Sequence, residues 1–200
     1  MEDFIPFCIQ NDCLPDVISW HLLANRAYNN AAPDISAFRA LEARYEKTYL
    51  DLYPDRESPF PIKVDINEYA APEEIAVPGS LVQYIARYDE LKMHGLLPYW
   101  NTANSIGSLL AGQNEPNGAW WLYKWYADMT GGDMAKITVV NARNENDPVG
   151  PGLYGLASIQ DDKRQVSIVF GGTKGDSTIV LNHVNDHVDS PAFLAGVEQV

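Results

Sequence analysis

The stretch Pro61-Ile62-Lys63-Val64-Asp65-Ile66-Asn67-Glu68-Tyr69-Ala70 decides the fold that the sequence predicts. Its apolar residues Ile62, Val64 and Ile66 alternate with polar ones, the pattern of a strand with one face against an apolar layer. We expect a strand over 62–67, because Pro72 prevents it from continuing much further. A carboxylate at the end of a buried strand makes Glu68 a candidate functional residue. The alternative is an ordinary loop acid that faces solvent.

The composition is that of a globular protein, with 46% apolar and 20% charged residues in 200. The net charge of −13 makes nucleic acid and anionic membranes poor partners. No segment has the length of a membrane span, and the N-terminus lacks the basic region of a signal peptide, so the localisation stays open. Cys8 and Cys13 have no metal-ligand spacing and are expected to be free thiols. Neither a metal nor a cofactor is predicted.

Short apolar strands and helical periodicities alternate over the first 130 residues or so. Strands are expected at 17–23, 62–67 and 96–101, and their starts lie about 35–45 residues apart. That spacing is typical of β/α units, in which successive strands are parallel and a helix connects them.

The helices between these strands carry terminal signals. Asp34 is expected to cap the helix before 62–67. Ser80 and Gln83 form a capping-box pattern for the next helix, which Gly95 is expected to close. A further helix is expected over 119–129. Its aromatic run at 120–126 suggests a sugar platform, but helical spacing favours burial of most of these rings in the core.

The pattern changes after Gly132 to short alternating strands at 137–140, 153–159, 165–170 and 178–182, typical of an antiparallel sheet. We therefore predict an α/β domain over residues 1–135 and a separate domain over 136–200 with a small antiparallel sheet. Three β/α units do not close a barrel, which needs about 250 residues. The first domain is either a small open parallel sheet or the last part of a barrel, and the pattern favours neither.

Four segments resemble retaining glycoside hydrolases of clan A, and the nearest resemblance is to family 39, the β-xylosidase and α-iduronidase relatives. In the order in which the family has them, they are Leu14-Pro15-Asp16-Val17-Ile18-Ser19-Trp20-His21, Ile66-Asn67-Glu68-Tyr69, Pro98-Tyr99-Trp100-Asn101 and the helix from Trp120 to Gly131. The resemblance implies a (β/α)8 barrel followed by a β-sandwich. By this resemblance the chain would be the carboxyl-terminal part of such an enzyme, with the last three β/α units over residues 1–135 and a small, incomplete antiparallel β-sandwich domain over 136–200.

The resemblance also implies roles for individual residues. Glu68 at the end of the seventh strand would be the nucleophile, His21 at the end of the sixth would line the site, and Trp100 at the end of the eighth would lie under the sugar. Retaining hydrolysis needs a second carboxyl group about 5–5.5 Å away. In the family this acid is an Asn-Glu pair at the end of strand four, which has no counterpart here. Further substrate-binding candidates are Asn67, Tyr69 and Asn101.

Two other Asn-Glu pairs occur, and chain order argues against both as the acid. Asn114-Glu115 follows the predicted eighth strand, and Asn144-Glu145 lies in the linker to the β-domain. The leading hypothesis is therefore a glycoside hydrolase fragment that acts on an oligosaccharide or glycoside and carries the nucleophile without the acid. The alternative is a non-catalytic carbohydrate-binding or structural module. Open sheet edges would permit self-association in either case.

Overall fold

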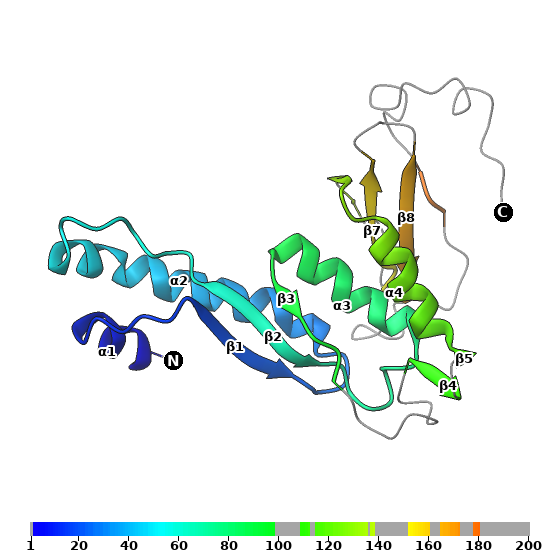
Figure 1. Cartoon of the computed structure of the whole chain (residues 1–200), viewed down its shortest axis with the longest axis horizontal. Coiled ribbons are helices and arrows are strands. Elements are labelled where there is room, and N and C mark those ends of the chain that lie inside the picture. The colour runs from blue at the N-terminus through cyan, green and yellow to red at the C-terminus, as the bar shows by residue number, and fades with distance from the viewer. Residues whose placement is uncertain are drawn as a thin grey trace. The chain divides into compact units, whose positions relative to one another are not determined.

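The computed structural model describes residues 2–98, 109–112, 115–135, 137–138, 152–160, 165–172 and 178–180 (Figure 1). The chain divides into two compact units. The first unit comprises Met1–Ala71 and Arg87–Pro98, and the second comprises Pro72–Ala86 and Tyr99–Val200. Among the described residues, no helix is long and apolar enough to cross a membrane.

A parallel sheet of three strands forms the centre of the first unit (Figure 1). Strand β1 (Val17–Leu22) pairs with β2 (Lys63–Tyr69), and β2 pairs with β3 (His94–Gly95). The two predicted strands that end near His21 and Glu68 are confirmed. The third strand begins earlier than predicted: β3 ends at Gly95, and among the described residues 96–98 the Leu96 N–H extends the pairing by donating to the Ile66 carbonyl at 2.9 Å. Of 96–101, residues 99–101 lie outside the described residues.

Helix α1 (Phe4–Gln10) precedes β1, and α2 (Tyr28–Leu52) connects β1 to β2. The prediction that Asp34 caps this second helix was wrong, because α2 begins six residues earlier and holds Pro33 in its second turn. A proline there leaves one backbone carbonyl without its helical donor. The early start buries Tyr28, whose ring lies 5.0 Å under the Arg87 guanidinium. Tertiary packing therefore overrides the local signal at Asp34.

Helix α3 (Pro78–Leu91) also begins and ends differently from the prediction. Pro78 is its first residue, a position where the missing N–H has no helical acceptor in any case. Lys92, with φ of 55°, takes the left-handed position after the helix that was assigned to Gly95. Gly95 instead lies in β3, where a Cβ would come within 2.5 Å of the Tyr88 ring. Close packing, and not a helix end, is the reason for this glycine.

A buried carboxylate joins α2 to the start of β2. Glu42 is only 3% exposed, and its Oε1 accepts the Ile62 N–H at 2.8 Å while its Oε2 accepts from Arg39 Nη1 at 2.6 Å. The same Arg39 nitrogen donates to the Ile62 carbonyl at 3.0 Å. Both the N–H and the carbonyl of Ile62 thus have hydrogen-bond partners just before the strand begins. These bonds fix the position of the start of β2 relative to α2.

We expect Glu42→Ala to lower the free energy of unfolding by about 2–3 kcal/mol, because it leaves a buried N–H and a guanidinium without their acceptor. Urea denaturation followed by circular dichroism measures this loss. The matched control on the same helix is Asp51→Asn, which breaks an exposed ion pair with Lys47 and should change stability by no more than about 0.5 kcal/mol. Equal losses in the two variants would contradict the role given to Glu42.

The second unit contains an antiparallel sheet in the order β6 (Asp133–Ala135), β7 (Tyr154–Ile159) and β8 (Val166–Gly171). The strands predicted at 153–159 and 165–170 are confirmed. The first strand lies earlier than predicted, since 137–138 are not in a strand. Residues 178–180 are not in a strand either, and the rest of 137–140 and 178–182 lies outside the described residues.

Gln83 connects α3 to this sheet within the second unit. Its side chain is fully buried, and its Nε2 donates to the carbonyl oxygens of Gly152 at 3.0 Å and Gly171 at 2.7 Å. The capping-box role predicted for Gln83 was therefore wrong. Gln83 instead holds the end of β8 next to α3, because its amide donates to the two backbone carbonyls.

Helix α4 (Gly118–Asp128) follows two short paired strands, β4 (Leu110–Gly112) and β5 (Glu115–Pro116). The side chain of Asn117 accepts the N–H groups of Ala119 and Trp120 at 3.0 and 3.1 Å and so caps the helix. Leu122 is buried, whereas Trp121 and Trp125 are 44% and 56% exposed. The other aromatic residues of the run, Trp120, Tyr123 and Tyr126, are partly exposed, so the prediction that most of the run lies in the core was wrong.

Candidate functional site

The side chains of β2 alternate between a buried and an accessible set. Val64 and Ile66 are buried, and Asp65 between them is partly exposed. On the neighbouring strand, Trp20 makes an edge contact with Phe38 of α2, with ring centroids 6.2 Å apart. One side of the sheet therefore lies under helix α2, and the opposite side carries the polar residues. The candidate site lies on this polar side, at the carboxyl ends of the strands.

Glu68 and His21 lie next to each other at those ends. The strand pairing aligns the two residues, and the His21 Nδ1 lies 3.7 Å from the Glu68 Oε2. This distance is longer than a hydrogen bond, so the two groups are adjacent rather than bonded. Their side chains are 48% and 40% exposed, which leaves both open to a ligand. The sequence-based expectation that strand ends bring Glu68 and His21 together agrees with this geometry.

Asn67 and Tyr69, on either side of Glu68, have different surroundings. The Asn67 Oδ1 atom is buried and has no hydrogen-bond partner among the described residues. An unpaired buried acceptor beside the carboxylate is compatible with the predicted contact to a sugar hydroxyl. Tyr69 is only 2% exposed, and its ring packs edge-on against Tyr88 with centroids 5.2 Å apart. Its ring thus contributes to the packing under α3, and its predicted contact with substrate stays a prediction.

Trp100 and Asn101 lie outside the described residues, so the predicted platform under the sugar stays a prediction. Glu115 lies in the exposed two-residue strand β5, before the cap of α4. Glu115 and the following Pro116 both pair with β4. Glu145 also lies outside the described residues.

The sequence-based reasoning missed two polar residues that the strand register brings to the same level of the sheet. Asp65 pairs with Ser19 on one side and with His94 on the other. His94 was assigned to the end of a helix, and its position became evident only once the start of β3 was known. No group of three His, Cys, Asp or Glu side chains that could hold a metal ion occurs in the described parts of the chain. Cys8 is buried and Cys13 exposed, and both are free thiols as predicted.

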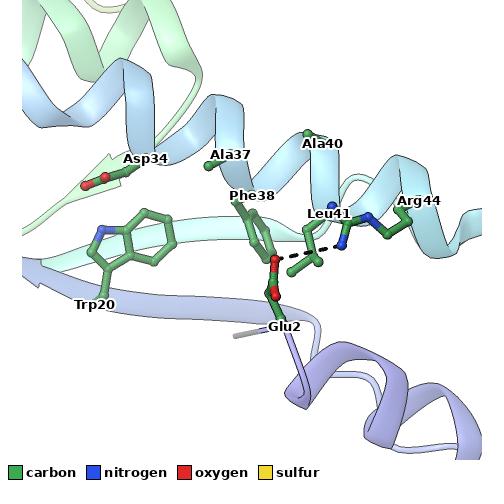
Figure 2. Close-up of a pocket in the computed structure, with 8 residues that line it drawn as sticks. All are labelled: Glu2, Trp20, Asp34, Ala37, Phe38, Ala40, Leu41 and Arg44. Carbon is green, nitrogen blue, oxygen red and sulfur yellow. Dashed lines mark ion pairs between the residues drawn. The ribbon is translucent and has the colours of Figure 1, made fainter.

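A separate pocket of about 370 Å³ lies on the helix-covered side of β1. Figure 2 shows Trp20 and Phe38 at its wall, with an ion pair of 3.8 Å between Glu2 and Arg44 across it. Because Trp20 precedes His21 in an alternating strand, this pocket is on the opposite side of the sheet from Glu68. Its other lining residues are Asp34, Ala37, Ala40 and Leu41.

The sequence of this chain is similar to those of two known enzymes. The chain is 30% identical over 169 residues to 3-O-alpha-D-galactosyl-alpha-L-arabinofuranosidase of Bifidobacterium longum subsp. longum, a match that covers 84% of the chain and 13% of the relative. It is 26% identical over 196 residues to 3-O-beta-L-arabinopyranosyl-alpha-L-arabinofuranosidase of Bifidobacterium pseudocatenulatum, covering 98% and 18%. No protein-family model and no solved structure matches the chain.

Both relatives are arabinofuranosidases, so the chain is related to glycoside hydrolases. The resemblance inferred from the four sequence segments is confirmed at this level. The chain spans less than a fifth of the length of either relative.

Proposed function

We propose that this chain is the carboxyl-terminal part of a retaining glycoside hydrolase of clan A, similar to family 39. Strands β1, β2 and β3 would be the sixth, seventh and eighth strands of a (β/α)8 barrel, and β6 to β8 would belong to the following β-sandwich. The parallel order β1-β2-β3, with a helix in each connection, supports this assignment. So do the polar groups at the carboxyl ends of β1 and β2, where barrel enzymes keep their sites.

The single observation that carries the proposal is the accessible Glu68 carboxylate 3.7 Å from His21 at the ends of two parallel strands. In the proposed reaction a Glu68 oxygen attacks the anomeric carbon, the bond to the leaving oxygen breaks, and a glycosyl ester forms on Glu68. Water then hydrolyses this ester and restores the carboxylate. His21 and Asn67, with Trp100 and Asn101, would bind the sugar, and the buried ring of Tyr69 would support the strand end by packing against Tyr88. No residue of this chain is assigned as the general acid.

For the substrate, we propose an α-L-arabinofuranoside. Both relatives are named for an α-L-arabinofuranosyl group that carries a second sugar on its 3-oxygen. A 3-O-substituted arabinofuranosyl glycan is therefore the substrate class with the strongest support. The net charge of −13 agrees with a neutral sugar as the ligand rather than an anionic one.

Covalent trapping tests this function. An activated 2-deoxy-2-fluoro-α-L-arabinofuranoside with a dinitrophenyl leaving group should form a stable ester on Glu68, because this leaving group departs without a proton. Mass spectrometry of the digested chain should find the added sugar on the peptide that contains Glu68, and Glu68→Gln should carry none. A label on another residue, or no label on the unaltered chain, would overturn the proposal.

A second function, glycan binding without catalysis, is favoured by one observation. Trp121 and Trp125 are exposed on one face of α4, with ring centroids 6.3 Å apart. Flat aromatic rings cover the apolar faces of sugars, and exposed apolar patches often mark ligand surfaces.

Under this second function, Trp121→Ala with Trp125→Ala should weaken binding of an arabinan oligosaccharide roughly tenfold, measured by calorimetry. Lys124→Ala, on the same helix, is the matched control and should leave the affinity unchanged. Glu68→Gln separates the two functions. A hydrolase loses turnover in this variant, whereas a binding module shows the same glycan affinity as the unaltered chain and no turnover in either. An affinity that is indifferent to both tryptophans would remove the support for the second function.

A further inference from the structure

The two cysteines lie at the two ends of the turn that closes helix α1. Asp12 takes the left-handed conformation, with φ of 52°. The Cys13 N–H donates to the Cys8 carbonyl at 2.9 Å, and the Asp12 N–H donates to the Ile9 carbonyl at 3.4 Å. These features define a Schellman motif, in which the side chains of the first and last residues of the turn are frequently in contact. In this motif both of those residues are cysteines.

The turn brings the two thiols within the reach of a disulfide. Backbone bond lengths and the hydrogen bond from Cys13 to Cys8 limit the distance between the two Cα atoms to at most about 7 Å. Disulfides join Cα atoms that are about 4.4–6.8 Å apart. Burial raises the pKa of the Cys8 thiol, and its hydrogen bond with the Cys13 thiol raises that pKa further. The side chains as well as the backbone are therefore in contact.

Side chains from the end of α2 hold this turn in place. The carboxylate of Asp12 accepts from the two terminal nitrogens of Arg56, at 2.5 and 3.0 Å. The Tyr53 hydroxyl donates to the Ile9 carbonyl at 2.8 Å, and its ring centroid lies 4.5 Å from the Arg56 guanidinium. The motif is thus fixed by contacts outside the turn, so that little conformational freedom is lost when a bond joins the cysteines.

The two thiols differ in their access to solvent. Cys8 is 2% exposed, whereas Cys13 is exposed. A reagent in solution therefore meets Cys13 first, and Cys8 is the neighbour that can displace it. An accessible thiol beside a second, resolving thiol is the usual arrangement of an oxidation-sensitive pair. The alternative is a contact between two small apolar side chains that only pack.

We propose that Cys8 and Cys13 form an intramolecular disulfide with a small disulfide oxidant such as oxidised glutathione, and that the Asp12–Arg56 ion pair holds the turn for this reaction. The Cys13 thiolate attacks the oxidant, forms a mixed disulfide and releases one glutathione. The Cys8 thiolate then attacks the Cys13 sulfur, and the second glutathione leaves. The two cysteines lose two electrons and two protons, which the two released thiols carry. This inference does not depend on the proposed function.

Mass spectrometry of the acid-quenched chain tests the disulfide. In an excess of oxidised glutathione, the unaltered chain should lose two hydrogen atoms and carry no glutathione. Cys8→Ala should instead keep one glutathione on Cys13, because no thiol is left to displace it. Cys13→Ala is the matched control and should stay reduced, because its remaining thiol is buried. An unaltered chain that stays reduced, keeps a glutathione, or forms a disulfide with a second copy would overturn the proposal.

The redox equilibrium tests the role of the ion pair. The squared concentration of reduced glutathione divided by that of oxidised glutathione, taken where half of the chain is oxidised, measures how firmly the fold holds the thiols together. Arg56→Ala should lower this value roughly two- to fivefold, the range expected for an exposed ion pair. Asp51→Asn, which breaks the exposed pair with Lys47, is the matched control and should leave it unchanged. Equal values in the two variants would refute the role given to the ion pair.

Discussion

Glu68→Gln should reduce the release of dinitrophenol from 2,4-dinitrophenyl α-L-arabinofuranoside by roughly 10³–10⁶-fold, the range expected when a covalent nucleophile is lost. The amide has nearly the shape of the carboxylate but lacks the charge that attacks the anomeric carbon. Sugar binding should therefore be retained while turnover is lost. The release of the phenol is followed by its absorbance, and sugar affinity by calorimetry.

Two controls accompany this prediction. Glu115→Gln changes another exposed glutamate of an Asn-Glu pair and should leave turnover of this substrate unchanged, because β5 carries no assigned catalytic role. Azide added to Glu68→Ala should restore part of the turnover and yield a glycosyl azide, because a small anion can attack from the space left by the side chain. Unchanged turnover in Glu68→Gln would show that Glu68 is not the nucleophile.

The regular parts of the site could be predicted from local sequence patterns. Ile62, Val64 and Ile66 alternate over enough residues to define β2, and the apolar run before His21 defines β1 in the same way. Parallel pairing then followed from the long helical segment between the two strands. Because the carboxyl ends of parallel strands meet at one edge, His21 and Glu68 could be expected side by side, as the structure has them.

Asn67 is an extra residue of β2 that has no partner in β1, so the pairing of the two strands contains a β-bulge. This bulge could not be predicted, because periodicity assumes that a strand keeps its period of two. The one local sign was Tyr69, a large ring at a position that alternation assigns to the polar side. Its burial against Tyr88 depends on where α3 ends, and that end was misplaced at Gly95. Because the end of α3 was predicted in the wrong place, the contact of Tyr69 with Tyr88, which determines the side that Tyr69 faces, could not be predicted either.

The helix starts show the same dependence on tertiary contacts. Asp34 has the chemistry of a cap, and Pro33 before it is unfavourable in a helix interior. The helix nevertheless continues back to Tyr28, because burial of that ring outweighs one lost backbone hydrogen bond.

The exposure of Trp121 and Trp125 could not be predicted for a different reason. Helical spacing places them on a common face, but spacing alone does not tell whether that face is covered.

The same chain should cleave an unactivated arabinofuranosyl disaccharide very poorly, even where it releases dinitrophenol from the activated glycoside. Cleavage of an ordinary glycosidic bond expels an alkoxide, which needs a proton as it leaves, and general acid assistance is worth roughly 10²–10⁴ in rate. No residue of this chain is assigned that role, whereas dinitrophenolate departs without it.

The measurement is a series of aryl arabinofuranosides with leaving groups of increasing pKa. The rate should fall steeply along the series, and it should be lowest for the disaccharide, assayed by chromatography. A shallow dependence would mean that an acid is present. The decisive control is again Glu115→Gln, because its Asn-Glu pair has the sequence of the acid in the family that the chain resembles. Rapid cleavage of the disaccharide, abolished by Glu115→Gln as well as by Glu68→Gln, would identify Glu115 as the acid and overturn the argument from chain order.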